Sequence, residues 1–218
     1  MEVNNIELIK PFINCNEGEF YLLQLIHRSK DGLTKFDSDD KKFYNKTIKS
    51  YYVTSPEYLD RKTDEIRELC HLFNARAYIN LNKKSRRQVA LKIIENIAHY
   101  LSAEDYTKNI PMIDAACGQT GACDKNKSWI VDIDTKNVEV VDDIKQMINS
   151  VEPFYAEDKI LLTVPTIHGY HLISKPFNKA KFNEIYNKKY PEKLDIHDNN
   201  PTILYAQTKD WTTWYSQI

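Results

Sequence analysis

Apolar residues recur with two different periods along the second half of the chain, and these periods predict a regular succession of strands and helices. Alternation with polar residues is typical of strands, and spacing of three or four positions is typical of helices. The predicted strands span residues 129–134, 159–164, 170–174 and 202–206, and the predicted helices lie near residues 142–151 and 179–190. Their order along the chain is that of the split βαβ, or ferredoxin-like, arrangement.

The first half has a weaker pattern. Ser55 is a suitable N-cap in front of a proline, and the apolar spacing that follows predicts a helix over residues 56–73. Residues 75–81 alternate as expected for a half-buried strand. Ser85 opens a capping box and therefore predicts the start of a second helix. Residues 29–49 are rich in Asp, Lys, Ser and Asn and are expected to form an exposed loop.

These elements predict an α+β protein. Residues 126–218 are expected to form a ferredoxin-like (RRM-like) palm that binds metal and carries the catalytic site. Residues 1–125 are expected to form an N-terminal α/β unit with a basic stretch for phosphate or nucleic acid. The chain has 218 residues, of which 42% are apolar and 28% are charged, so one compact folded molecule is expected.

Charge and cysteine content narrow the expected partners and the compartment. The formal net charge is −1, so any contact with nucleic acid must come from a local basic patch. The sequence has neither a secretory signal pattern nor an apolar run of bilayer length, which predicts a cytoplasmic protein without a membrane partner. Four cysteines without paired CxxC motifs leave open a zinc site built from Cys70, His71, Cys117 and Cys123.

Asp132 and Asp134 are the first candidates for chemistry. They lie two positions apart on a predicted strand, so both side chains point to the same face. Two ionised carboxylates side by side repel each other unless a cation lies between them, and hard oxygen ligands favour Mg²⁺ or Mn²⁺. The alternative is a strand end whose acids are only solvated.

A second candidate element follows a turn. Gly169 would permit close backbone approach there, and His171 lies on the strand that leaves the turn. A histidine beside a metal site can donate to a triphosphate oxygen or transfer a proton, although it can equally be a core histidine bonded to a backbone carbonyl. Asp195 or Asp198 could supply a third carboxylate if the last strand pairs beside the first, and both could also be loop residues.

These three elements, in this order, resemble the signatures of the archaeo-eukaryotic primase superfamily, the primase-polymerases. The first signature, a strand of the form hydrophobic-hydrophobic-Asp-hydrophobic-Asp, looks like residues 130–134. The second, a small residue followed by any residue and His, looks like residues 169–171, and the late hydrophobic-Asp looks like Leu194-Asp195. The resemblance is confined to about the last third of the chain, and no zinc-binding module or helicase domain of the family is recognisable.

By this resemblance, Asp132, Asp134 and Asp195 are metal ligands and His171 holds the phosphates of the incoming nucleotide. The implied activity is that of a DNA primase or DNA-directed nucleotidyltransferase in DNA replication, with two Mg²⁺ or Mn²⁺ ions. Nucleoside triphosphates and a single-stranded DNA template are the implied partners, with a replication protein as a further one. A non-catalytic nucleic-acid-binding module and a metal-dependent phosphodiesterase or nuclease remain as alternatives.

Basic residues add a candidate phosphate-binding surface. Residues 74–94 contain six basic residues and no acid, several of them at the start of a predicted helix, where the macrodipole favours an anion. A solvated basic face is the alternative interpretation. The phosphate-binding candidates are Arg76, Lys83, Lys84, Arg86 and Arg87, together with Lys175 from a second basic excess between residues 153 and 193.

Overall fold

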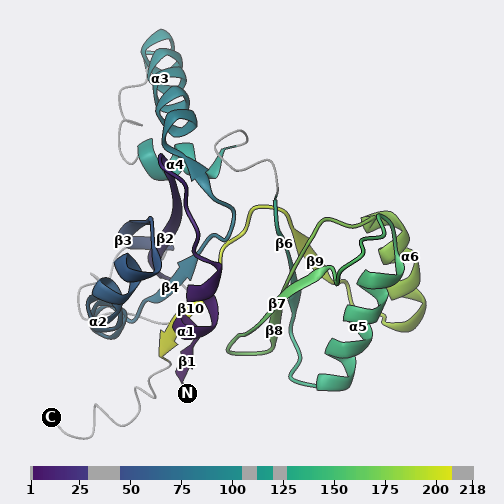
Figure 1. Ribbon diagram of the computed structural model, residues 1–218. Coiled ribbons are helices and arrows are strands. Elements are labelled where there is room, and N and C mark those ends of the chain that lie inside the picture. Colours follow the sequence, from purple (N-terminus) through teal and green to yellow (C-terminus); the bar gives the residue numbers. More distant parts are fainter. Residues whose placement is uncertain (1, 29–44, 105–111, 120–126, 208–218) are drawn as a thin grey trace, which may run out of the picture.

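The computed structural model of the protein describes residues 2–28, 45–104, 112–119 and 127–207 (Figure 1). These residues form two antiparallel sheets with α-helices packed against them, which confirms the predicted α+β class. In Figure 1 the first sheet with α2 and the second sheet with α5 and α6 form two halves, and α3 projects away from both. Among the described residues, no helix is both long enough and apolar enough to cross a membrane.

The first sheet has six strands and contains residues from both ends of the chain. Its order is β1-β10-β4-β2-β3, and β5 pairs with the other end of β2. The strands are β1 (Glu2–Asn4), β2 (Glu19–His27), β3 (Lys46–Val53), β4 (Arg76–Ile79), β5 (Lys84–Ser85) and β10 (Thr202–Gln207).

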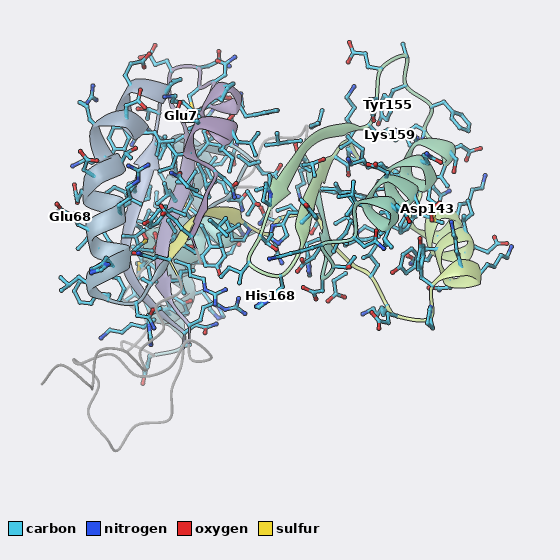
Figure 2. The ribbon with its side chains drawn as sticks, turned by 90° about the horizontal axis from the view of Figure 1, so that it is seen from below. Glu7, Glu68, Asp143, Tyr155, Lys159 and His168 are labelled. Carbon is cyan, nitrogen blue, oxygen red and sulfur yellow. The ribbon has the colours of Figure 1, made fainter. Side chains whose placement is uncertain are left out.

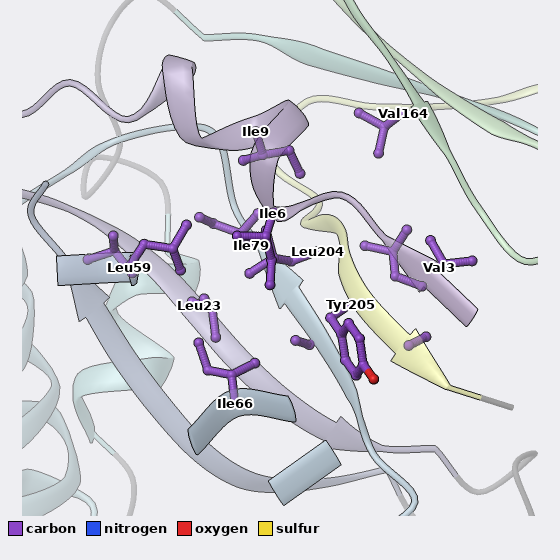
Figure 3. Packing of buried hydrophobic residues seen from close by; sticks show 14 of the residues in the cluster. Val3, Ile6, Ile9, Leu23, Leu59, Ile66, Ile79, Val164, Leu204 and Tyr205 are labelled. Atoms are coloured by element: carbon purple, nitrogen blue, oxygen red, sulfur yellow. The ribbon is translucent and has the colours of Figure 1, made fainter. Parts of the chain in front are cut away.

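Helices cover both faces of this sheet. The helical elements of this half are α1 (Ile6–Ile9), the 3-10 helix η1 (Lys10–Phe12), α2 (Pro56–Leu72), α3 (Arg86–Ser102) and α4 (Met112–Gly118). Ser55 accepts a hydrogen bond from the backbone N–H of Tyr58, and Ser85 accepts one from that of Gln88, so both predicted caps are confirmed. Figure 3 shows the main core, in which Leu59 and Ile66 of α2 pack against strand residues such as Leu23.

The second sheet has four strands in the order β7-β8-β6-β9, and every pairing in it is antiparallel. Its elements are β6 (Trp129–Ile133), α5 (Val138–Ser150), β7 (Ile160–Pro165), β8 (Tyr170–Ser174), α6 (Lys179–Lys189) and β9 (Asp195–His197). Helices α5 and α6 cover one face, where Val131, Ile133 and Leu172 are buried with Ile144 and Phe182. The opposite face therefore remains for contact with the first sheet.

Three predicted elements need correction. The strand at residues 202–206 exists, but it pairs with β1 and β4 in the first sheet instead of completing the second. The fourth strand of the second sheet is β9, where the sequence pattern predicts no strand. Residues 46–49, the end of the expected loop, belong to β3, whereas residues 29–44 lie outside the described part of the chain.

Helix α5 begins at Val138, four residues before the predicted start, because Asn137 caps it through a hydrogen bond from the N–H of Glu139. Its other end is capped by a buried lysine, since Nζ of Lys159 donates to three carbonyls there. The oxygens of Ile148 and Asn149 each lie 3.0 Å from this nitrogen, and the third acceptor is the oxygen of Val151.

Replacing Lys159 by methionine is expected to lower the free energy of unfolding by about 2 kcal/mol, because methionine keeps the apolar stem and leaves buried carbonyls without a donor. Urea unfolding followed by circular dichroism would measure this change. Lys145→Met is the matched control, since Lys145 is a surface residue paired with Asp142, and it is expected to cost less than about 1 kcal/mol. Equal stability of the two variants would contradict the capping role.

Glu65 on α2 gives the first half a pH-dependent contact with β3. Its carboxylate accepts from Nζ of Lys49, from Nζ of Lys62 at 2.8 Å and from the hydroxyl of Tyr51 at 3.0 Å. These bonds, the one from Lys49 foremost, lower the pKa of Glu65 to about 2. The folded pKa is below the unfolded value of about 4.3, so the stabilisation is present above that pH and is lost as pH falls toward 2.

Glu65→Gln is therefore expected to destabilise the protein by up to about 1 kcal/mol at pH 7, a small value because the pair is partly exposed. The difference from wild type should shrink at pH 3, as measured by urea unfolding at both pH values. Glu68→Gln, at an exposed position on the same helix (Figure 2), is the control and should change stability little at either pH. A difference for Glu65→Gln that stays constant with pH would refute the assignment.

Candidate functional site

The two sheets meet through apolar contacts and enclose a cleft. Ile130 and Ile173 of the second sheet, together with Val164, join the same buried cluster as Ile6 and Ile9 of α1 (Figure 3). Beside this contact lies a cavity of about 400 Å³. Its polar lining comes from both sheets and includes Arg28, Arg76 and Tyr78 on one side and Asp132, Asp134 and His171 on the other.

Strand register brings three of the predicted site residues into one row. In β6, Asp132 is paired with His171 of β8 on one side and with Asp195 of β9 on the other. Val131 and Ile133 are buried under the helices, so the intervening residue, Asp132, points into the cleft, as the alternation predicted. The second sheet thus places two carboxylates and an imidazole side by side.

His171 links the two sheets. Its Nε2 lies 3.3 Å from Oδ1 of Asp132, and its Nδ1 lies 2.9 Å from Oγ1 of Thr202, a fully buried residue of β10 in the first sheet. A carboxylate only accepts, so a neutral His171 donates from Nε2 to Asp132 and accepts from the Thr202 hydroxyl. The imidazole orientation is therefore set by one group from each sheet.

The same hydrogen bond keeps Asp132 ionised. Donation from His171 lowers the pKa of the Asp132 carboxyl, and the positive charge of the nearby Arg28 lowers it further, whereas burial opposes the shift. Its side chain is 38% exposed, so one edge of the carboxylate remains accessible from the cleft. Asp132 is thus a charged acceptor at neutral pH and is available to a cation or a hydrogen-bond donor.

Gly169 makes the close approach that the sequence predicted. A Cβ at this position would lie 1.8 Å from the carbonyl oxygen of Ile133 and 2.7 Å from the backbone nitrogen of Thr135. The β7–β8 turn therefore lies directly against the end of β6, next to Asp134. Figure 2 shows His168, the neighbour of Gly169, at this turn, where it also lines the cleft.

Cations of the first sheet face these acids. Arg28 follows directly after β2, and its guanidinium Nη1 lies 3.4 Å from the hydroxyl of Tyr78 on β4. Arg76, the first residue of β4, lines the same cleft. Guanidinium groups bind phosphate oxygens, and carboxylates bind divalent cations, so a cleft with both on opposite walls suits a metal-bound polyphosphate.

The donor set fits a magnesium-type ion that shares its coordination with a ligand. Such ions use one or two carboxylates and complete their shell with water and substrate phosphate. Asp132 and Asp134 can supply these carboxylates. In the part of the chain that the structure describes, no three acidic, histidine or cysteine side chains form a ready-made metal cluster. The described residues therefore do not form a metal site that is enclosed by protein ligands alone.

Of the two candidates for a third carboxylate, Asp195 lies in the row beside Asp132, whereas Asp198 does not. Asp195 is 59% exposed, with Nζ of Lys193 at 3.5 Å. Asp198 belongs to the connection between the sheets, where its carboxylate lies 3.7 Å from Nζ of Lys127. Asp195 is thus the residue of the two that could join a metal site at Asp132 by a side-chain rotation.

Most of the predicted phosphate-binding residues lie away from the cleft lining. Lys84 is only 1% exposed, and its Nζ donates to Oδ1 of Asn199. Lys83 pairs with Glu19 on the first sheet. The remaining positions are Arg86, over the ring of Phe20, Arg87, on the first turn of α3, and Lys175, paired with Glu157. Among these candidates, only Arg76 lines the cleft.

Buried asparagines hold the two connections between the sheets. The amide of Asn82 donates to the carbonyls of Ser128 and Asp198, at 3.0 Å each, and accepts from the N–H of Ser128. Asn80 donates to the carbonyl of Asn199. Since residues 127–128 enter the second sheet and residues 198–201 leave it, these bonds fix how the cleft walls face each other.

The structure also separates two members of the zinc alternative. Cys70 is buried in the cluster of Leu23, whereas Cys117 is buried in that of Leu22. Neighbouring residues of a strand point to opposite faces, so the two cysteines lie on opposite faces of the first sheet. Cys123 lies outside the described residues. The described residues therefore do not bring the zinc candidates together.

Sequence reasoning missed Arg28 and His197 in the cleft lining and Thr202 as the buried partner of His171. Arg28 follows a nearly continuous apolar run that forms β2, and such a run is typical of a strand buried on both faces. A cationic residue directly after such a strand is the feature of the sequence that could have identified Arg28. Thr202 had no local signal, because its partner is 31 positions away in the sequence.

Comparisons of the chain with protein-family models, with curated proteins and with solved structures give no match. The function proposed below is therefore based on the geometry of the cleft.

Proposed function

We propose that this protein is a divalent-metal-dependent nucleotidyltransferase of primase-polymerase type, acting on nucleic acid with nucleoside triphosphates. The observation that carries the proposal is the cleft itself, in which Asp132 and Asp134 face Arg28 and Arg76 across one cavity. Acids alone would repel a triphosphate, and arginines alone would bind it without a place for its metal. Both together match the needs of phosphoryl transfer, which depends on positioning and charge stabilisation.

The strand order of the second half supports the same proposal. In chain order, β6, α5, β7, β8, α6 and β9 follow the split βαβ sequence, with β9 as the fourth strand. The spatial order β7-β8-β6-β9 places the first and third strands at the centre of the sheet. We take this half to be a palm, with Asp132 and His171 on its two central strands, β6 and β8.

Each cleft residue has a role in this proposal. Asp132 and Asp134, joined by Asp195, would hold the two Mg²⁺ or Mn²⁺ ions, which supply activation of the attacking hydroxyl and neutralisation of the leaving pyrophosphate. His171 keeps Asp132 oriented and ionised through its Nε2–H. Arg76 and the neighbouring Arg28 would bind the triphosphate oxygens from the opposite wall.

The reaction joins a 3′-hydroxyl oxygen to the α-phosphorus of a nucleoside triphosphate as the bond to pyrophosphate breaks. Water as the nucleophile would make the same site a nuclease. A non-catalytic RNA-recognition type of module would present aromatic side chains on its central strands. The cleft face of β6 and β8 instead presents Ile130, Asp132, His171 and Ile173. This composition favours metal-assisted chemistry over base stacking on the sheet.

Incorporation of labelled nucleotides on a single-stranded DNA template, with and without an annealed primer and in Mg²⁺ or Mn²⁺, tests the proposal. Primer extension that is lost in Asp132→Ala/Asp134→Ala would establish nucleotidyl transfer, and extension without primer would make the enzyme a primase. Degradation of the template would assign the site to hydrolysis. Binding of the template without any reaction would leave a binding module and refute the enzyme.

A further inference from the structure

A second cavity, of about 350 Å³, opens on the other side of the candidate metal ligands. Asp132 and Asp134 line both this cavity and the cleft, so the two carboxylates lie between two hollows. The second cavity lies between the end of β6, the start of α5 and the chain that leads from α6 into β9. Its volume falls within the range of small-molecule sites.

The two hollows differ in charge. The cleft contains Arg28 and Arg76, whereas the only cation that lines the second cavity within the described residues is Lys193. Four carboxylates line the second cavity, those of Asp132, Asp134, Asp195 and Glu192. A phosphate group would be repelled there, whereas these carboxylates can accept hydrogen bonds from the hydroxyl groups of an uncharged ligand.

A tyrosine ring forms a fixed wall of the second cavity. The hydroxyl of Tyr190 donates to the Asp143 carboxylate at 2.8 Å, and the Tyr190 ring lies 5.0 Å from that of Tyr186. Tyr186 is buried and in turn stacks on Phe182 at 5.7 Å. The ring of Tyr190 is thus held by Tyr186 and by Nζ of Lys189, which lies 5.7 Å from the ring centroid. The ring remains partly exposed, and a planar group can stack on its exposed part.

We infer that the second cavity binds the base and sugar of a nucleoside whose hydroxyl points at Asp132 and Asp134. The ring of Tyr190 stacks the base, and the surrounding carboxylates accept hydrogen bonds from the sugar hydroxyls. Apolar Val140 and Leu194 border the same space. The reaction in this inference rests on the proposed function: the second cavity would hold the substrate that carries the attacking hydroxyl, and the cleft would hold the triphosphate. Binding of a nucleoside in the cavity does not depend on that reaction.

Chemical-shift titration of the ¹⁵N-labelled full chain with adenosine tests the inference without catalysis. The largest shifts are expected in residues 190–195 and around Val140. Tyr190→Ala should weaken binding about tenfold, because stacking of the base is lost. Tyr190→Phe keeps the ring and should bind within about twofold of wild type. Tyr155→Ala, which removes an exposed tyrosine elsewhere on the second half (Figure 2), is the matched control.

Val140→Phe supplies an independent variant, since it fills the cavity and leaves Tyr190 in place. It should also weaken adenosine binding about tenfold or more, by excluding the ligand. Adenosine that causes no shifts at this cavity, or that binds Val140→Phe and Tyr190→Ala as tightly as it binds wild type, would overturn the inference.

Tripolyphosphate with Mg²⁺ is the second probe and should shift residues near Arg28, in wild type and Tyr190→Ala alike. If tripolyphosphate with Mg²⁺ causes no shifts while adenosine does, the result counts against the proposed function and supports the nucleoside cavity. If adenosine causes no shifts while tripolyphosphate with Mg²⁺ does, the nucleoside assignment of the second cavity is refuted and the cleft remains the proposed triphosphate site.

Discussion

Asp132→Asn is expected to reduce nucleotide incorporation by at least about 100-fold in Mg²⁺ or Mn²⁺, because a bound metal supplies several kcal/mol of charge stabilisation and an amide is a poor ligand for it. The fold should persist, since the asparagine oxygen can still accept the hydrogen bond that His171 donates to Asp132. Steady-state incorporation and urea unfolding, measured on the same preparation, separate the two effects. The expected loss of unfolding free energy is below about 1.5 kcal/mol.

Asp198→Asn provides the control, because Asp198 has the same side chain and lies in the connection outside the row of Asp132. It is expected to keep activity close to wild type, whereas Asp195→Asn should lose activity if Asp195 completes the metal site. Activity of Asp132→Asn within about threefold of wild type, a difference under about 1 kcal/mol, would exclude this carboxylate from the chemistry.

Gly169→Ala is expected to lower the free energy of unfolding by about 3 kcal/mol, because no rotamer change can relieve a clash between Cβ and backbone. The added atom would lie 1.8 Å from the Ile133 oxygen, so either the turn or the end of β6 must move. Asp134 directly follows Ile133, and its carboxylate should therefore be displaced as well. We expect a melting temperature lower by roughly 10 °C, together with strongly reduced incorporation at temperatures where the variant is still folded.

Gly118→Ala is the matched control. A Cβ on Gly118, the last residue of α4, meets no atom within 4 Å. Alanine is favoured over glycine in helices by up to about 1 kcal/mol, so this variant should unfold at or slightly above the wild-type temperature. If Gly169→Ala behaves like Gly118→Ala, the contact between the turn and β6 is looser than the structure indicates.

Local pattern was enough for several parts of the second half. Alternation in β6 and β8 placed Asp132, Asp134 and His171 on a face opposite to Val131 and Leu172, and the structure confirms this division. The face of a strand residue depends only on its position relative to its neighbours, so it can be inferred without knowing the partner strands. The caps of α2 and α3 are local hydrogen bonds and were predicted for the same reason.

Long-range pairing was the main source of error. The strand at residues 202–207 has the pattern of a buried strand, yet nothing in that pattern states which sheet it joins. Its partners, β1 and β4, begin at positions 2 and 76, far away in the sequence. The basic stretch failed as a guide to the cleft for a similar reason, because the burial of Lys84 against Asn199 depends on a contact across 115 positions.

By itself, the sequence determined the α+β class, the caps of α2 and α3, the strand faces of Asp132 and His171, and the tight turn at Gly169, since each depends on spacing among near neighbours. Only the tertiary structure decided which strands share a sheet, that Arg28 faces the carboxylates, and that Thr202 orients His171. These features arise where segments far apart in the chain meet, and their free energy comes from packing and hydrogen bonds that exist only after folding.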